Sequence, residues 1–355
     1  MSMTREHRLG LLRSLMAGAA GGGLLDLIGM PLAWLVGPIL GNLLLLAGGH
    51  AVWIPGPLRA FSLGVIGLVM GGMVTPDLMD RLMQWHLSVL ILVAGVTVST
   101  LLVARWYRRC GFDAPSAWLS AMPGGMAAMV AIADSAGGNL QRVSISQSLR
   151  VLTVICVLPP LFVLFGRGGE GTVVTVIEGG GFSNAWMLLM IPLLVPLGIR
   201  LGISAAPLLM PLMFSAALSA TDLARFEVPA WTMNLALLCL GCSIGAKFGV
   251  FSLKTLVANA RITLVATLMA IGILAVFAEM IHQTTGVGRE VALLALAPGG
   301  MAEMSALAVV LGLDPLFVAF HQLLRVIGLM VLAPYISRRM TMAKPASKEK
   351  RGRER

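Results

Sequence analysis

Apolar residues dominate long stretches of this chain, and most charged residues fall between those stretches. The uncharged runs 87–104, 151–165, 186–199 and 262–278 are each close to the length that a helix needs to cross a hydrocarbon layer of about 30 Å. Their apolar residues are continuous rather than alternating, which argues against membrane-spanning strands. The pattern therefore predicts an all-α polytopic membrane protein.

Composition agrees with this prediction. Hydrophobic residues make up 57% of the 355 residues and charged residues 12%, and a soluble fold of this size would have too little polar surface to cover its core. The formal charge of +10 does not indicate nucleic-acid binding, because residues 338–355 hold eight Lys or Arg and two Glu, or six of the ten charges. We expect this segment to be a disordered basic cytoplasmic tail that touches anionic lipid.

One segment of the chain occurs twice. Residues 123–159 and 298–334 align without a gap at an offset of 175, and both begin with Pro-Gly-Gly-Met. The two copies also share a Gln-x-x-Arg motif, at Gln147 and Arg150 in the first and at Gln322 and Arg325 in the second. The pairing continues more weakly toward the N-terminus, so the chain is an internal duplication of two half-proteins.

Loop charges predict that the two halves are inverted. In the first half, the loop near 77–81 is acidic and the loop near 105–113 is basic. In the second half, the counterpart loop near 247–261 is basic and the loop near 279–290 carries two Glu and one Arg. The positive-inside rule then places equivalent loops on opposite sides of the membrane, which makes the halves inverted repeats.

Inversion requires an odd number of crossings in each half, yet each half has six apolar segments. In each half, one segment must therefore enter the membrane without crossing it, and the best candidate is the Pro-Gly-Gly segment. A proline followed by two glycines cannot continue a helix, and the limbs on either side are too short to span. We predict two re-entrant hairpins with tips at 123–125 and 298–300. A discontinuous helix that crosses the membrane completely is the alternative.

The resulting topology has about 10 transmembrane helices, with both termini in the cytoplasm and the chain in a bacterial inner (plasma) membrane. The expected units are a first membrane repeat (1–165), an external linker (166–184), a second membrane repeat (185–337) and the tail (338–355). We expect spans at 9–28, 32–47, 58–74, 86–105 and 143–165, then at 185–201, 206–220, 231–248, 261–281 and 315–336, with hairpins at 116–137 and 290–312.

The hairpin tips are the candidate solute-binding site. Broken helices in inverted-repeat transporters place the N-termini of half-helices near the bilayer midplane, where free N–H groups and the helix dipole favour anions. The i, i+3 spacing of each Gln-x-x-Arg motif puts both polar side chains on one face of the following helix. The candidate residues are Pro123, Gly124, Gly125, Gln147, Arg150, Pro298, Gly299, Gly300, Glu303, Gln322 and Arg325.

Structural roles compete with solute binding at these positions. Arg150 and Arg325 either bind a solute or cap hairpin carbonyls and snorkel to an interface, and the two roles can coexist. Glu303 stands where the first half has Ala128, and is a coupling carboxylate, a partner of Arg325 or a favourable charge at a helix N-terminus. His321, beside Gln322, is expected to be a packing histidine.

The Pro-Gly-Gly-Met segments with their Gln-x-x-Arg motifs, together with Pro-Leu-Ala-Trp-Leu-Val-Gly-Pro at 31–38, resemble the AbrB-type membrane protein family of Gram-negative bacteria. The resemblance covers nearly the whole chain and implies a duplicated integral membrane protein, distinct from the small soluble DNA-binding regulator of the same name. Family members carry labels as regulators of gene expression and as ammonia monooxygenases. The second half lacks a clear counterpart of Trp34.

The residue types argue against an oxygenase, which needs clustered His and carboxylate ligands. The five histidines are scattered, with neither a His-x-His nor a Glu-x-x-His pattern. We therefore expect no catalytic residues, no metal and no cofactor.

The favoured function is a secondary transporter of a small, anionic solute by alternating access, and the alternative is a membrane-embedded regulator of gene expression that acts through metabolite sensing or a partner. The expected partners are a small-molecule solute and the lipid bilayer, with no direct nucleic acid; assembly into a homo-oligomer stays open.

Overall fold

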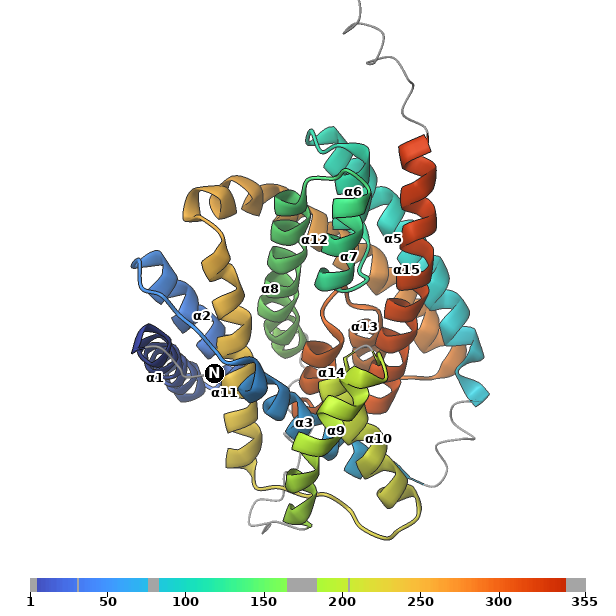
Figure 1. Cartoon of the computed structure of the whole chain (residues 1–355). Helices are drawn as coiled ribbons and strands as arrows, with labels where there is room; N and C mark the ends of the chain where they lie inside the picture. Colours follow the sequence, from blue (N-terminus) through green and yellow to red (C-terminus); the bar gives the residue numbers. More distant parts are fainter. Residues whose placement is uncertain (1–4, 31, 76–82, 165–183, 204, 343–355) are drawn as a thin grey trace, which may run out of the picture.

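The computed structural model describes residues 5–30, 32–75, 83–164, 184–203 and 205–342, and all of its regular elements in these ranges are helices (Figure 1). The first half contains α1 (Arg5–Leu27), α2 (Ala33–Ala47), α3 (Gly56–Gly72), α5 (His86–Arg109), α6 (Ala114–Ala121), α7 (Met126–Ser135) and α8 (Leu140–Leu164). The second half contains η1 (Ala185–Met190), α9 (Ile191–Arg200), α10 (Ala206–Ala220), α11 (Ala230–Ala246), η2 (Lys247–Val250), α12 (Leu253–Thr285), α13 (Arg289–Leu296), α14 (Met301–Val310) and α15 (Pro315–Met342).

The order of long and short helices in the second half repeats that of the first, which confirms the predicted all-α, duplicated membrane fold. The predicted spans agree closely with the observed helices, and α12 shows the largest difference because it begins at Leu253 rather than at 261. The predicted external linker lies almost entirely in 165–183, and most of the predicted tail in 343–355, both outside the described residues. The loop near 77–81, used above for the inversion, lies outside them too.

Among the described residues, five helices are long and apolar enough to cross a membrane, namely α5, α8, α11 with η2, α12 and α15. The other predicted crossings fall on α1 and on shorter apolar helices. At a rise of 1.5 Å per residue, the 15 residues of α2 reach only about 23 Å, which is less than the usual hydrocarbon thickness. Short helices of this kind are accommodated by local thinning of the bilayer, by snorkelling of flanking side chains or by oligomerisation.

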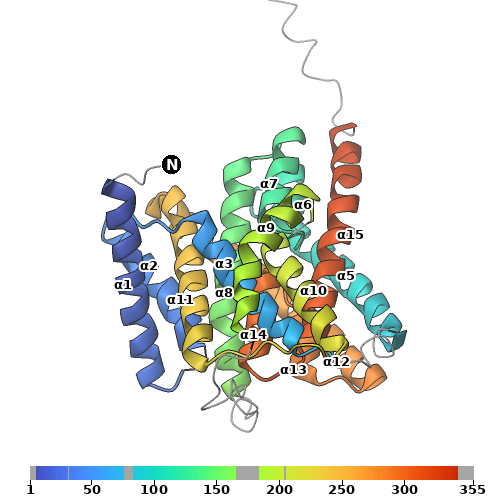
Figure 2. The same ribbon diagram turned by 60° about the horizontal axis from the view of Figure 1, so that its bottom comes forward.

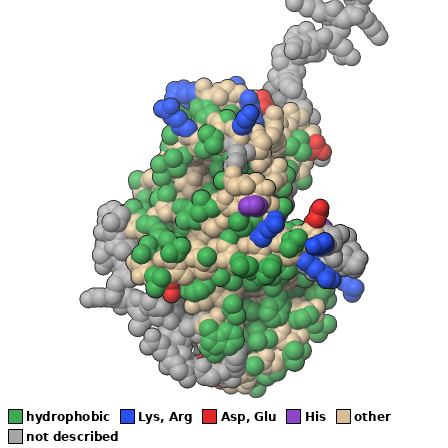
Figure 3. Space-filling view, turned by 90° about the vertical axis from the view of Figure 1, so that its left-hand side faces the viewer, with side chains coloured by type: hydrophobic (Ala, Val, Ile, Leu, Met, Phe, Trp, Pro, Cys, Tyr) green, Lys and Arg blue, Asp and Glu red, His purple; other side chains and the backbone are tan. Residues whose placement is uncertain are grey.

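The helices form two groups. The panel consists of α1, α2 and α3 with their counterparts α9, α10 and α11, and the hairpin group consists of α5 to α8 with α12 to α15. Most of the packing lies within each group, while α3 contacts α14 between them. Figure 3 shows the face of α1, α2 and α11, where hydrophobic side chains cover most of the surface and Lys and Arg gather toward the top and one side.

Glycines allow the panel helices to approach closely. A Cβ on Gly67 of α3 would lie 2.3 Å from the Leu208 carbonyl oxygen of α10, and one on Gly241 of α11 would lie 2.5 Å from the Leu35 oxygen of α2. These small residues thus mark close contacts between panel helices. Backbone contact at both positions leaves no room for a larger side chain.

The short helices α6 and α7 form a hairpin that returns to the end from which it enters. Their outer ends are joined by a hydrogen bond of 2.7 Å, which the Asn139 amide after α7 donates to the Ser116 Oγ at the start of α6. A Cβ on Gly138 would also lie 3.4 Å from the Ser116 nitrogen. With 8 and 10 residues, the helices reach about 12 and 15 Å, too short to cross. The structure therefore has the re-entrant form and not the discontinuous crossing helix.

The two hairpins enter from opposite ends of the helix bundle. Figure 1 shows α6 and α7 in its upper half and α13 and α14 in its lower half. Figure 2 places the start of α1, the base of α6–α7 and the C-terminal end of α15 together at the top, with α13 at the bottom. The arrangement is that of inverted repeats, and it brings the two tips toward the middle of the molecule.

Candidate functional site

A glutamine and an arginine from α8 hold the tip of the first hairpin. The Gln147 Nε2 donates hydrogen bonds to the Leu119 and Met122 carbonyl oxygens, at 2.6 and 3.0 Å. The Arg150 Nη1 donates to the same Met122 oxygen at 3.1 Å. Carbonyl groups at the C-terminal end of a helix lack donors inside it and favour a nearby positive charge. Both side chains therefore cap the end of α6.

The same arrangement recurs 175 residues later. The Gln322 Nε2 donates to the Leu294 and Ala297 carbonyl oxygens, at 2.8 and 3.1 Å. These acceptors stand at the positions equivalent to those of Gln147, so the duplicated sequence has kept a duplicated hydrogen-bond pattern. The spacing predicted that the Gln and the Arg of each motif share one helix face, and in the structure both side chains contact the preceding hairpin.

Arg325 makes more hydrogen bonds than Arg150. Its Nη1 donates to the Ala297 and Leu296 carbonyl oxygens, at 2.6 and 3.3 Å, and its Nη2 donates to the Gly299 oxygen at 3.0 Å. Nη2 also donates to the Gln322 Oε1. The capping role, which the sequence left open beside solute binding, is thus present at both arginines, while solute binding stays a prediction.

The remaining candidate residues lie in the two tips. Pro123, Gly124, Pro298 and Gly299 are buried, and Gly125 and Gly300 are partly buried. The φ of Gly125 is +88°, in the region that favours glycine, whereas Gly300 has an ordinary φ of −81°. The two tips therefore have the same sequence but different backbones at their last glycine.

The two tips lie close to each other along α15. A Cβ on Gly124 would lie 3.0 Å from the Cβ of Leu329, which is one turn beyond Arg325 on α15. The Arg150 and Arg325 guanidinium groups are near enough for their like charges to interact. Each is at most 6% exposed, and neither contacts a carboxylate among the described residues. Two buried positive charges thus lie within electrostatic reach of each other, beside the part of α15 that both tips contact.

Glu303 is not a partner of Arg325. Its side chain turns back over the start of α14, so that a Cβ on Gly300 would lie 2.0 Å from the Glu303 Oε2. Lys247 of η2 is within electrostatic reach of this carboxylate and of Arg59 on α3. The nearness of Lys247 and Arg59 could not be predicted from the sequence, because η2 and α3 approach α14 only through the tertiary fold.

His321 is a packing residue, as expected. Its Nε2 lies 2.8 Å from the Ser88 Oγ on α5, and its Nδ1 lies 2.8 Å from the Phe317 carbonyl oxygen. The ring also stacks against Phe317, with 4.0 Å between ring centroids. Both nitrogens are therefore occupied, and the side chain is fully buried beside α5.

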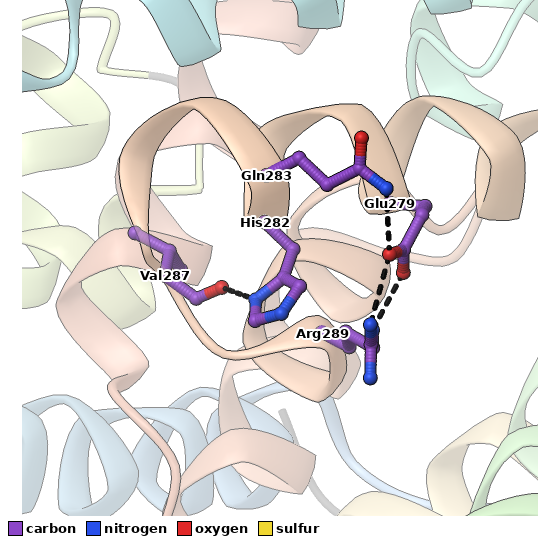
Figure 4. A network of polar contacts seen from close by, with 5 residues as sticks. All are labelled: Glu279, His282, Gln283, Val287 and Arg289. Carbon is purple, nitrogen blue, oxygen red and sulfur yellow. Dashed lines mark hydrogen bonds and ion pairs between the residues drawn. The ribbon is translucent and has the colours of Figure 1, made fainter.

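A polar network closes the base of the second hairpin (Figure 4). The Arg289 Nε and Nη2 donate to the two Glu279 carboxylate oxygens, at 2.6 and 3.0 Å, and the Gln283 amide donates to one of them. The hydrogen bond to Glu279 raises the pKa of Arg289 above its usual range. The His282 ring contacts the Val287 oxygen and ties down the turn between α12 and α13. Gln283 and Arg289 are exposed and Glu279 and His282 are partly buried, so this network belongs to the hairpin base rather than to the tip.

No group of three His, Cys, Asp or Glu residues in the described ranges is placed to hold a metal ion. The cysteines Cys239 and Cys242 are both free thiols. The Cys242 Sγ lies 3.3 Å from the Ser14 carbonyl oxygen in the contact between α11 and α1. This contact is one of packing within the panel.

Comparison with known proteins agrees with the duplicated architecture. A family model described as "Transition state regulatory protein AbrB" matches residues 34–341, which include both hairpins. "Uncharacterized protein YhjN" of Bacillus subtilis (strain 168) is 26% identical over 352 residues, covering 89% of each chain. "Putative regulator AbrB" of Escherichia coli (strain K12) is 26% identical over 318 residues, covering 87% of this chain and 90% of its own. Similar proteins thus occur in Bacillus as well as in a Gram-negative bacterium.

Proposed function

The chain belongs to the AbrB family, and on that premise we propose that it is a secondary transporter that moves a small anionic solute by alternating access. The observation that carries the proposal is the pair of buried arginines at the meeting tips, with no carboxylate partner among the described residues. A buried charge without a counter-charge costs several kcal/mol. An anionic solute between the tips would supply that counter-charge.

The two helix groups support alternating access. Inverted repeats with broken helices transport by movement of one bundle against another around a central site. Here both hairpins belong to one group, and that group packs against the panel mainly through α3 and α14. In this proposal the hairpin group carries the solute past the panel, and the two inverted tips face opposite sides in turn.

The proposal places the protein in the bacterial inner membrane with both termini in the cytoplasm. Basic residues support this orientation, because Arg108 and Arg109 end α5, Arg142 begins α8 and Lys254 begins α12 at the same end of the bundle (Figure 2). An excess of Lys and Arg marks cytoplasmic loops. Introduced cysteines near Arg108 and near Lys254 are expected to react with a membrane-impermeant reagent from the same side.

The test is a thermal-shift screen of the purified protein in detergent against small organic acids, amino acids and inorganic ions. A solute that binds only the folded state stabilises it by about 2.7 kcal/mol at one hundred times its dissociation constant. We expect an anion to raise the unfolding temperature of the parent and of the exposed control Arg225→Met, but not of Arg150→Met. Uptake of that anion into proteoliposomes then tests transport. Stabilisation by no anion would count against the proposal.

A regulator of gene expression is the second candidate, supported by the printed name of the Escherichia coli relative. Such a protein would act through metabolite sensing or a partner and not through direct DNA contact. Deletion of residues 344–355 separates the two functions. A transporter is expected to keep its flux without this segment, whereas a regulator that signals through it would lose its effect on transcription. In either case we assign no catalytic step, because the site offers caps and charges rather than a nucleophile or a ligand set.

A further inference from the structure

The two hairpin tips differ in the side chain at the third residue of the inner helix. In α14 this residue is Glu303, which is 95% buried and lies over the start of its own helix. In α7 the equivalent residue is Ala128, which has no polar group. The surrounding sequence is otherwise the same Pro-Gly-Gly-Met segment, so this difference separates two sites that the duplication would have made alike.

Both inner helices begin with backbone amides that have no acceptor inside the helix. The first helical hydrogen bond of α14 runs from the Met304 amide to the Gly300 oxygen, and that of α7 from the Met129 amide to the Gly125 oxygen. The three preceding amides of each helix therefore need another partner. Helices commonly meet this need with a carboxylate side chain at their own third position, because it lies near the free amides and complements the helix dipole.

At α14 the chain supplies this anion itself. The Glu303 carboxylate occupies the space over Gly300, and Lys247 lies within electrostatic reach to balance it. Arg325 is occupied as well, because its two terminal nitrogens donate to three carbonyl oxygens and to Gln322. The second tip thus has an internal anion and an arginine whose two terminal nitrogens are both occupied, although the buried Nε of Arg325, like that of Arg150, has no partner in the described part of the chain.

At α7 the same positions are unfilled within the described residues. Gly125 precedes the helix without a side-chain cap, and no carboxylate stands at its third position. Arg150 is 6% exposed and makes a single hydrogen bond, from Nη1 to the Met122 oxygen, while its buried Nε has no partner in the described part of the chain. The Met122 oxygen ends α6 in the tip, four residues before α7 begins, so Arg150 keeps unused donors in the tip that leads into this helix.

We infer that the solute binds by an oxyanion group, a carboxylate or an inorganic oxyanion, at the start of α7 beside Arg150, and that Glu303 fills the equivalent position at α14. This inference rests on the proposed function and deepens it, because it assigns one anion to the protein instead of one to each repeat. Internal duplication produced two possible sites, and the residue at position 303 closed one of them.

The experiment moves the internal anion from one tip to the other. Purified full-length parent, Ala128→Glu, its neutral control Ala128→Gln, and Glu303→Gln are titrated with sodium acetate, succinate and phosphate, and binding is followed by thermal shift at constant ionic strength. Acetate and succinate represent carboxylates and phosphate represents inorganic oxyanions. Constant ionic strength matters because screening by salt alone changes charged interactions.

We expect the Ala128→Glu variant to bind the effective anion about tenfold more weakly than the Ala128→Gln control, which corresponds to about 1.4 kcal/mol. We expect Glu303→Gln to bind it more tightly than the parent, because a negative charge near the meeting tips is removed. Without any anion, Ala128→Glu should unfold at a higher temperature than Ala128→Gln, since its carboxylate complements the α7 dipole. This last measurement shows that the variant is folded.

Two results would overturn the inference while leaving the proposed function in place. In one, the parent binds an anion, and Ala128→Glu binds it as well as Ala128→Gln does. In the other, Glu303→Gln loses the anion and Ala128→Glu keeps it, which would put the site at α14. If the parent binds none of the three probes, the inference and the proposed transport of such anions fail together.

Discussion

The two hairpins are closed differently at their bases. At the start of α6, the Asp113 carboxylate caps the helix by accepting a hydrogen bond of 3.1 Å from the Ser116 amide. The equivalent residue before α13 is Gly288, which has no capping side chain, and the ion pair between Arg289 and Glu279 stands nearby instead. The bases are exposed, so water can satisfy their polar groups and many different side chains are tolerated.

The tips are closed alike. Gln147 and Gln322 bind equivalent pairs of carbonyl oxygens, and Arg150 and Arg325 bind the last of them. At buried tips each carbonyl must find a donor within the protein, and an unsatisfied one costs about 1 to 3 kcal/mol. The comparison teaches that burial, rather than duplication alone, kept the Gln-x-x-Arg motif in both halves.

The largest effect is expected from the tip arginines. Replacing Arg325 by Met leaves three backbone oxygens and the Gln322 Oε1 without this donor, and should lower the free energy of unfolding by about 3 kcal/mol or more. Replacing Arg150 by Met removes one hydrogen bond and should cost about 1 to 2 kcal/mol. Denaturant unfolding in detergent measures both. Equal losses would show that the two arginines are equivalent, against the contacts described above.

The next largest effect is expected from alanine substitutions at Gly125 and Gly300, which should destabilise the two tips for different reasons. Alanine at Gly125 must adopt a φ of +88°, which costs about 1 to 3 kcal/mol. Alanine at Gly300 has an allowed φ, but its Cβ would lie 2.0 Å from the Glu303 Oε2. The cost of Gly300→Ala should therefore shrink in a Glu303→Ala background by about 0.5 kcal/mol or more, as measured by a double-mutant cycle. Gly125→Ala serves as the control, and its cost should not change in that background.

These glycines also mark the limit of what the sequence predicts. The repeated Pro-Gly-Gly pattern predicted both hairpins and the Gln-x-x-Arg residues beside them, because helix breaking and helix periodicity are local properties. Both tips have the sequence Pro-Gly-Gly-Met, so the different backbone conformations of Gly125 and Gly300 could not be predicted from it. The different contacts of Arg150 and Arg325 were hidden for the same reason, since they depend on the tertiary setting of each tip.

Charged residues at helix ends produced the one clear error in span limits. Lys254 and Arg261 were assigned to a loop, yet both lie within α12, which begins at Leu253. Long basic side chains can lie along a helix and place their charges at the membrane surface, so they do not end it. The nearness of Lys247 to Glu303 was also beyond the sequence, because 56 positions separate the two residues and only the packing of η2 near α14 joins them.

A smaller effect is expected from the helix cap that differs between the bases. Asp113→Ala removes the hydrogen bond to the Ser116 amide and should cost about 1 kcal/mol. Gly288→Ser adds a cap at the equivalent position of α13 and should gain a few tenths of a kcal/mol, about the usual difference between Ser and Gly there. The unfolding temperatures of both variants test this. A loss from Gly288→Ser would mean that the second base has no room for a cap.

The smallest effect is expected at the ion pair shown in Figure 4. Arg289 and Glu279 form a bidentate pair whose side chains are 46% and 38% accessible, and solvent-exposed pairs contribute little because water and salt screen them. Arg289→Gln should therefore lower the unfolding temperature less than Asp113→Ala does, and the difference from the parent should disappear at high salt. A large, salt-independent loss would show that this base depends on its ion pair as strongly as the tips depend on their arginines. The contrast between replaceable bases and constrained tips would then fail.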